Sequence, residues 1–216
     1  MNIKNLEFNL EELKILAENG QKDLEHAVGY YYEFGVKNAP VDYEKAAEWY
    51  KKAADKGNAE SMVHLGSFYA TGKGVPQNQR TAFSYIRKAA EAGDMNGQYN
   101  LARCFEEGIG TFPDRSKAFD WYKKAADQND FRAMCCVASY LLEGTIVPQD
   151  MKKAFKLMKQ AAFANLPPAQ YNLSLLYRYG EGTEQDLEKA NEWLTKAAQN
   201  GFPLAKKDLF GKEIDE

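Results

Sequence analysis

The sequence predicts an all-α fold in which five helix–turn–helix units of 36 residues stack along the chain. Three features recur at this period and predict it together. Pairs of alanines fall every 36 residues, at 53–54, 89–90, 125–126, 161–162 and 197–198. The first glycine of a loop recurs at nearly the same spacing, at Gly35, Gly72, Gly108, Gly144 and Gly180. An aspartate or asparagine suited to begin a helix recurs at Asp42, Asn78, Asp114, Asp150 and Asp186.

Each unit is predicted to contain two helices, illustrated by residues 60–71 and 79–92. The first has the i, i+3, i+4 apolar spacing of an amphipathic helix, at Leu65, Phe68 and Tyr69. The loop TGKGVPQ then ends this helix with glycine and proline. Asn78 follows as an N-cap, since its side chain can accept from a free N–H of the next helix. Left-handed C-caps of the second helices are expected at Gly57, Gly93, Gly201, Asn129 and Asn165.

Small residues recur at two equivalent positions and predict close helix crossings. The first helices carry them at Gly29, Gly66, Ala102, Ala138 and Ser174. The second helices carry them at Ala46, Ala82, Ala118, Ala154 and Ala190. A larger side chain at either position would force the paired helices apart. Large residues are expected to pack around them as one column, formed by Trp49, Tyr85, Trp121, Leu157 and Trp193.

The two ends of the chain are predicted to be atypical units that close the stack. Residues 9–20 resemble a second helix without its first, and residues 202–216 contain a first helix without its second, followed by a charged tail. Between them the predicted repeats are 21–57, 58–93, 94–129, 130–165 and 166–201. No linker interrupts them, so the sequence predicts one domain over residues 1–216.

Composition excludes several classes of function. The net charge of −3 lacks the clustered basic footprint of a nucleic-acid surface. No apolar run approaches the ~20 residues that span a bilayer, so membrane insertion is not expected. Three cysteines without regular spacing indicate no disulfide framework and fit a reducing compartment. We therefore expect a cytoplasmic protein, or a periplasmic or secreted one if a leader was removed.

Two longer motifs carry a family resemblance. The run KAAEWYKKAA at 45–54 recurs as KAFDWYKKAA at 117–126, and a Leu-Gly pair at 65–66 precedes Tyr69. With the G-x-G loops, these units resemble Sel1-like repeats, relatives of tetratricopeptide repeats, over about residues 21 to 201. The fourth unit departs from the pattern, with Ile146 at the second loop glycine and Leu157-Met158 in place of Trp-Tyr.

The resemblance implies a right-handed α-solenoid whose first helices line a concave groove. In the family this groove is an adaptor surface for other proteins, and the resemblance implies no reaction and no cofactor. In the tetratricopeptide register, the partner-binding side chains include Tyr30, Phe34, Tyr99, Arg103, Tyr171, Leu175 and Arg178. The alternative is that some of these tyrosines only fill space between units.

Motifs that might carry chemistry favour structural interpretations. The G-x-G loops lack the preceding strand and following Lys-Ser/Thr of a phosphate-binding loop. Basic pairs such as Lys51-Lys52 and Lys123-Lys124 lie near helix C-termini beside acids, which indicates a solvated outer face rather than an anion-binding stripe. The two histidines, His26 and His64, have no serine or cysteine beside them in the repeat register, which argues against catalysis. No zinc site is expected.

Finer expectations concern His64, which is equivalent to Asn100 and Asn172. We expect these three to be interior polar residues that bond neighbouring backbone, whereas His26 faces the groove. The best-supported function is a non-enzymatic scaffold that binds a peptide or partner protein, present as a monomer or in weak end-to-end association. The alternatives are a protein that binds or hydrolyses cell-wall or β-lactam-like compounds, and a secreted effector that acts on host proteins.

Overall fold

The computed structural model describes residues 8–211, and all regular structure in this range is helical. The chain divides into two compact units, up to Asp114 and from Arg115, which are described separately. The first unit contains α1 (Leu10–Ala17), α2 (Lys22–Phe34), the 3₁₀ turn η2 (Val36–Asn38), α3 (Tyr43–Asp55), α4 (Ala59–Thr71), α5 (Gln79–Glu91) and α6 (Met95–Glu107). The second contains α7 (Arg115–Asp127), α8 (Phe131–Glu143), α9 (Met151–Phe163), α10 (Pro167–Tyr179), α11 (Leu187–Gln199) and α12 (Pro203–Phe210).

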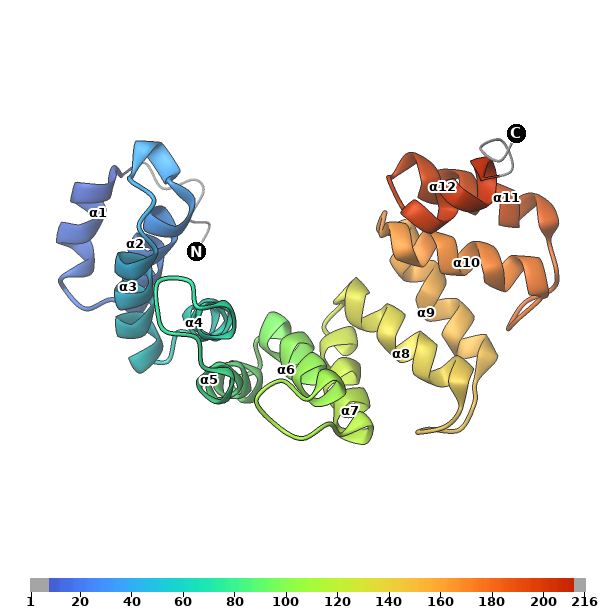
Figure 1. Cartoon of the computed structure of the whole chain (residues 1–216), viewed down its shortest axis with the longest axis horizontal. Helices are drawn as coiled ribbons and strands as arrows, with labels where there is room; N and C mark the ends of the chain where they lie inside the picture. Colours follow the sequence, from blue (N-terminus) through green and yellow to red (C-terminus); the bar gives the residue numbers. More distant parts are fainter. Residues whose placement is uncertain (1–7, 212–216) are drawn as a thin grey trace. The chain divides into compact units, whose positions relative to one another are not determined.

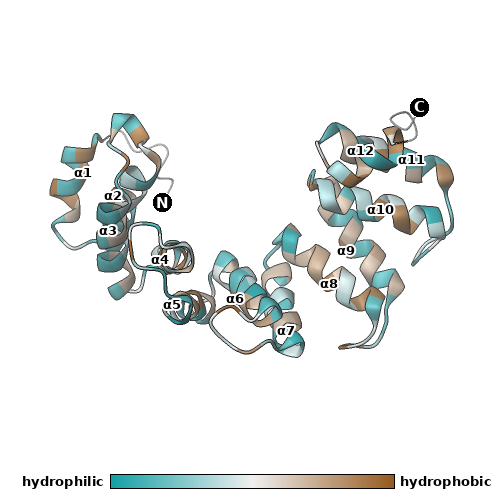
Figure 2. Ribbon diagram, in the orientation of Figure 1, coloured by the Kyte–Doolittle hydropathy of each residue, from teal (hydrophilic) through white to brown (hydrophobic). Residues whose placement is uncertain are grey.

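Within each unit, helices consecutive in the chain pack against one another, as Figure 1 shows. The predicted all-α solenoid of helix pairs is therefore confirmed. The helices carry both hydrophobic and hydrophilic residues, as the colours in Figure 2 show. Burial of the apolar face against the neighbouring helices holds each helix in place, because isolated 13-residue helices are marginal in water.

The ends of the helices follow the sequence pattern. The carboxylate or amide oxygen of Asp42, Asn78, Asp150 and Asp186 accepts from the backbone N–H three residues on, as predicted for N-caps. The expected C-caps have left-handed backbone, including Asn129 at φ 70° and Asn165 at φ 60°. The first helices have similar N-caps at Asn58, Asp94 and Asp130, which the 36-residue pattern had not predicted.

The small residues lie at helix crossings, as predicted. A Cβ on Gly66 would lie 2.5 Å from the Ile86 side chain of the partner helix, and one on Gly29 would lie 2.7 Å from the Tyr50 ring. The matching alanines of the second helices are at most 1% exposed. These positions therefore set how closely the two helices of one repeat approach each other.

The predicted column of large residues is wrong by one position in the first four repeats, whereas in the fifth both the predicted Trp193, 7% exposed, and Leu194 are buried. The side chains buried over the crossings belong to the next residue, at Tyr50, Ile86, Tyr122, Met158 and Leu194. Trp49 and Trp121 are half-buried instead, and a lysine three residues on covers each ring, with Lys52 Nζ 3.9 Å and Lys124 Nζ 3.6 Å from the ring centroids. Both residues of the Trp-Tyr pair are large, so size alone did not distinguish the inward one.

The second glycine of the G-x-G loop is a contact between repeats. A Cβ on Gly74, Gly110 or Gly182 would overlap the carbonyl oxygen of Tyr43, Gln79 or Met151, respectively. Each of these carbonyls belongs to the first residue of the second helix one repeat earlier. The loop therefore packs backbone against backbone, and only glycine fits there.

We predict that Ala118→Leu lowers the free energy of unfolding by roughly 1–3 kcal/mol, because Ala118 is fully buried at a crossing and cannot accept extra methylenes. Urea denaturation followed by circular dichroism measures this change. Lys123→Leu, on the exposed side of the same helix, is the control. A stability for the Ala118 variant equal to that of the parent would contradict the close crossing.

Candidate functional site

A cleft lies between the first helices α4 and α6 in the first unit. Its volume is about 310 Å³, and Ser67 and Thr71 line one wall while Asn100 and Arg103 line the other. Ile86 of α5 and Cys104 form its apolar floor. The first helices bury Leu65 and Leu101 inward, so the polar residues of the same helices are left at the cleft.

A cleft at equivalent repeat positions lies between α8 and α10 in the second unit, with a volume of about 440 Å³. Its lining residues are Ser139, Leu142, Glu143, Met158, Asn172, Leu175, Leu176 and Glu181. Each lies 72 residues, or two repeats, after a residue that lines the α4–α6 cleft. The same repeat geometry therefore opens the same site twice, and both volumes fall in the range of small-ligand and side-chain pockets.

An asparagine projects into each cleft, at Asn100 and at Asn172. Both residues are half-buried, and neither side-chain amide is hydrogen-bonded within residues 8–211. The expectation that they bond neighbouring backbone in the interior is therefore wrong. A primary amide offers two N–H donors and one carbonyl acceptor, so each cleft presents unused hydrogen-bonding capacity above an apolar floor.

The equivalent position between α2 and α4 is filled by the protein's own side chains. His64, which corresponds to Asn100, stacks on the Tyr50 ring with centroids 4.6 Å apart. Its Nδ1 lies 2.8 Å from Glu33 Oε2, and the Tyr50 hydroxyl donates to the same oxygen at 2.8 Å. Lys73 Nζ lies 3.8 Å from Glu33 Oε1. We call these four residues the Glu33 cluster.

The electrostatics of the Glu33 cluster favour a charged carboxylate. Burial acts to raise the pKa of Glu33, but the hydrogen bond and charge of His64, the Tyr50 hydroxyl and the Lys73 charge outweigh it. The pKa of Glu33 is therefore held below its ordinary value of 4.5. Burial raises the pKa of Tyr50, which keeps its hydroxyl protonated as a donor.

The predicted partner-binding residues are brought together only in part. Tyr30 and Phe34 lie at the edge of the filled α2–α4 position, with ring centroids 4.5 Å apart, and Phe34 is 53% exposed. Arg103 lines the α4–α6 cleft and forms an ion pair with Glu107 at 2.9 Å. Leu175 lines the α8–α10 cleft.

Three other predicted residues do not line either cleft. Tyr99 and Arg178 are half-buried on α6 and α10. Tyr171 contacts other residues of the chain. Its hydroxyl donates to Asp208 Oδ2 at 3.0 Å, and the centroids of the Tyr171 and Phe202 rings lie 5.1 Å apart. The terminal helix α12 therefore contacts the residue that the tetratricopeptide register assigned to a partner.

The structure corrects the reading of the histidines. His26 is the interior one, 3% exposed, whereas the His64 side chain is 27% exposed. Ser61 Oγ lies 2.8 Å from His26 Nδ1, and Glu60 Oε2 lies 3.2 Å from His26 Nε2, so the expectation that no serine lies beside a histidine is wrong. The hydrogen bond between His26 and Glu60 lowers the pKa of Glu60. Ser61 is 0% exposed, so its hydroxyl is inaccessible to a substrate.

Two of the three cysteines are weak nucleophiles. Burial raises the pKa of Cys104 to about 11 and that of Cys135 to about 12, so both thiols stay protonated and weakly nucleophilic. Within residues 8–211, His, Cys, Asp and Glu form no group of three that could hold a metal ion. No helix in the same range is long and apolar enough to cross a bilayer.

The repeats agree with a comparison of the sequence with known families. The model described as "Sel1 repeat" matches residues 23–58, 59–94, 96–130, 132–162 and 167–202. The chain belongs to the Sel1 repeat family. Proteins of this family are generally protein-interaction scaffolds rather than catalysts.

Similar solved structures include a Sel1 repeat protein from Oxalobacter formigenes, 31% identical with a TM-score of 0.83 over 94% of this chain. A second is c5321, a protective antigen of uropathogenic Escherichia coli, 26% identical with a TM-score of 0.74 over 94% of this chain. This chain spans 59% and 51% of those two chains.

A curated relative is the ERAD-associated E3 ubiquitin-protein ligase component HRD3A of Arabidopsis thaliana. It is 39% identical over 67 residues, which make up 30% of this chain and 10% of the plant protein. The match therefore covers a short stretch of repeats in a much longer protein.

We predict that the Glu33 cluster makes stability depend on acid pH. A carboxylate whose pKa is lowered on folding stabilises the fold above its unfolded pKa, near 4.5, and this contribution is lost as the pH falls through the folded pKa. Glu33→Gln keeps an acceptor for Tyr50 but cannot titrate. Below about pH 4.5 its unfolding free energy will therefore fall less steeply than that of the parent.

Urea unfolding measured across this pH range tests the difference. Glu48→Gln, an exposed carboxylate on α3 outside the cluster, controls for the loss of one negative charge. Parallel curves for the parent and Glu33→Gln would show that the cluster does not couple protonation to folding.

Proposed function

We propose that this chain is a non-enzymatic scaffold that binds a peptide or partner protein along the groove lined by the first helices of the repeats. The observation that carries the proposal is the cleft that recurs, at equivalent positions, between α4 and α6 and between α8 and α10. A binding protein built from repeats presents such equivalent sites along one surface.

The chemistry of the two clefts fits an extended peptide. An extended strand of peptide leaves its backbone N–H and C=O groups unpaired, and an asparagine side chain can donate to one and accept from another. Asn100 and Asn172 hold their amides free for this purpose above Ile86 and Met158. In each cleft, the apolar floor would receive a side chain of a bound peptide, while the asparagine amide would bind the peptide backbone.

The remaining predicted residues extend this proposal to the edges of the clefts. Phe34 presents an exposed ring that contacts the tilted ring of Tyr30, and aromatic side chains frequently dominate interface energetics. Arg103 and Leu175 occupy equivalent positions on α6 and α10. Glu107 pairs with Arg103 in the free chain, so a partner that binds the Arg103 guanidinium must compete with Glu107.

We predict that Asn100→Ala and Asn172→Ala each weaken peptide binding by about 2- to 12-fold. The estimate assigns about 0.5–1.5 kcal/mol to one hydrogen bond between an amide and the peptide backbone. Peptides selected from a random phage-displayed library on the parent protein supply the ligands, and isothermal titration calorimetry measures the affinities. Ser84→Ala, on the exposed side of α5, is the control.

A second comparison separates the clefts from the aromatic edge. A combined variant tests the aromatic residues that the tetratricopeptide register predicts to bind a partner. It carries Tyr30→Ala, Phe34→Ala, Tyr99→Ala and Tyr171→Ala. Retained affinity in this variant, with loss in the asparagine variants, would restrict the site to the clefts. Retained affinity in both sets, with the fold intact, would overturn the proposal.

A further inference from the structure

The helix α9 differs in charge from the other second helices. Its sequence, MKKAFKLMKQAAF, carries four lysines and no acid, in a chain whose net charge is −3. All four lysines are exposed, and no carboxylate of residues 8–211 lies within 4.0 Å of their ammonium groups. Lys152, Lys156 and Lys159 follow one another at intervals of four and three residues, so they share one side of the helix with Phe163.

Comparison with the other repeats shows what α9 has lost. Lys51 pairs with Asp55 at 3.2 Å, and Arg87 pairs with Glu91 at 2.7 Å, each four residues apart on its helix. Lys159 is the equivalent of Lys51 and Arg87, but Phe163 takes the place of the acid. The equivalents of Lys156 include three acids, at Glu48, Asp120 and Glu192. In the fourth repeat, a neutralised surface has therefore become basic and aromatic.

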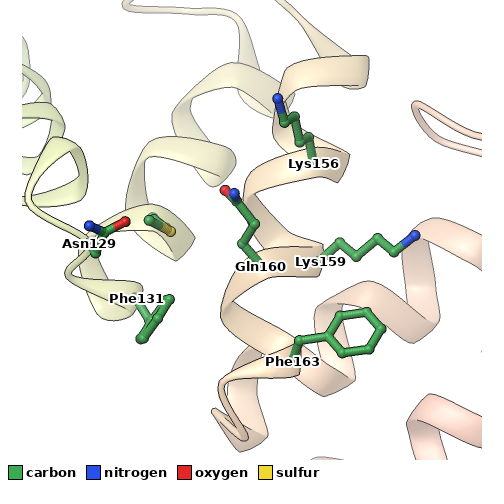
Figure 3. A pocket seen from close by; sticks show the side chains of 7 residues that line it. Asn129, Phe131, Lys156, Lys159, Gln160 and Phe163 are labelled. Atoms are coloured by element: carbon green, nitrogen blue, oxygen red, sulfur yellow. The ribbon is translucent and has the colours of Figure 1, made fainter.

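A pocket adjoins this surface. It has a volume of about 410 Å³ and is lined by Asn129, Phe131 and Met134 on one side and by Lys156, Lys159, Gln160 and Phe163 on the other. Figure 3 shows Gln160 pointing toward Asn129, while Lys159 and Phe163 extend from the opposite side of α9. Phe163 is 64% exposed and Phe131 38% exposed, although the Phe163 ring also contacts Trp193, with centroids 5.1 Å apart.

We propose that Lys156, Lys159, Phe163 and the adjoining pocket form a second interaction surface, which binds an acidic peptide segment that carries a large apolar side chain. The apolar side chain would enter the pocket between α8 and α9 and cover the exposed rings. The neighbouring carboxylates would pair with the lysine ammonium groups, which have no competing acid in contact. Charge complementarity selects this occupant, because the surface is basic while the rest of the chain is acidic overall.

The chain itself supplies helix-compatible residues for a variant that tests this surface. The fifth repeat carries Glu192, Thr195 and Gln199 at the positions of Lys156, Lys159 and Phe163. The triple variant Lys156→Glu, Lys159→Thr, Phe163→Gln therefore gives α9 the residues that α11 already holds in a helix. The matched control is Lys51→Thr, because Lys51 occupies on α3 the position that Lys159 occupies on α9. The single variant Lys156→Glu is the second test if the triple variant loses helicity.

The probe is a short fluorescein-labelled peptide of alternating glutamate and leucine, with affinity measured by fluorescence anisotropy on the full chain. We expect the triple variant to bind at least about tenfold more weakly, Lys51→Thr to bind as the parent does, and added salt to weaken the parent complex. A glutamate–serine peptide of the same length is expected to bind more weakly, because it leaves the pocket empty.

Three outcomes would overturn the proposal. The first is equal affinity for the parent and the variants, and the second is equal binding of a lysine–leucine peptide. The third is capture of phosphatidylglycerol vesicles or duplex DNA in place of the peptide, abolished by the same variants, which would identify a lipid or nucleic-acid surface instead. None of these outcomes bears on Asn100 or Asn172, so this surface and the first-helix clefts fail or stand separately.

Discussion

The close crossing of the two helices in each repeat is the constraint on which the rest of the structure depends. At Gly66 the approach leaves no room for a Cβ beside Ile86, and at Gly29 none beside Tyr50. Once the pair is fixed at this distance, one large side chain from the second helix closes the interior of the repeat. The remaining apolar face of the pair must then be covered by the next repeat, which is why the units stack.

The same scaffold tolerates different side chains at the surfaces between repeats, and function follows from those differences. At one equivalent position, Asn100 and Asn172 leave a cleft open, whereas His64 closes it by joining Tyr50 and Glu33. At another, the acid that three repeats carry, at Asp55, Glu91 and Asp127, becomes Phe163 in the fourth. Comparison of the repeats within the chain therefore separates what maintains the stack from what varies upon it.

The fold was predictable because period, caps and small residues all constrain the backbone of one unit. The errors have a different origin. Ser61 and His26 belong to neighbouring repeats and occupy positions that are not equivalent. A comparison of equivalent positions therefore could not predict their contact. Trp49 and Tyr50 differ by 100° around their helix, and only the crossing angle decides which one is buried. The clefts likewise depend on the spacing of whole helices, which the residue pattern does not specify.

The G-x-G loops have a mechanical consequence. In the sequence they look like the most expendable part of each repeat, yet Gly74, Gly110 and Gly182 lie against the start of a helix one repeat earlier. Each loop therefore packs against the second helix of the preceding repeat and is not only a connection. A residue inserted at Gly110 would therefore disturb packing against Gln79 at the start of α5, one repeat upstream.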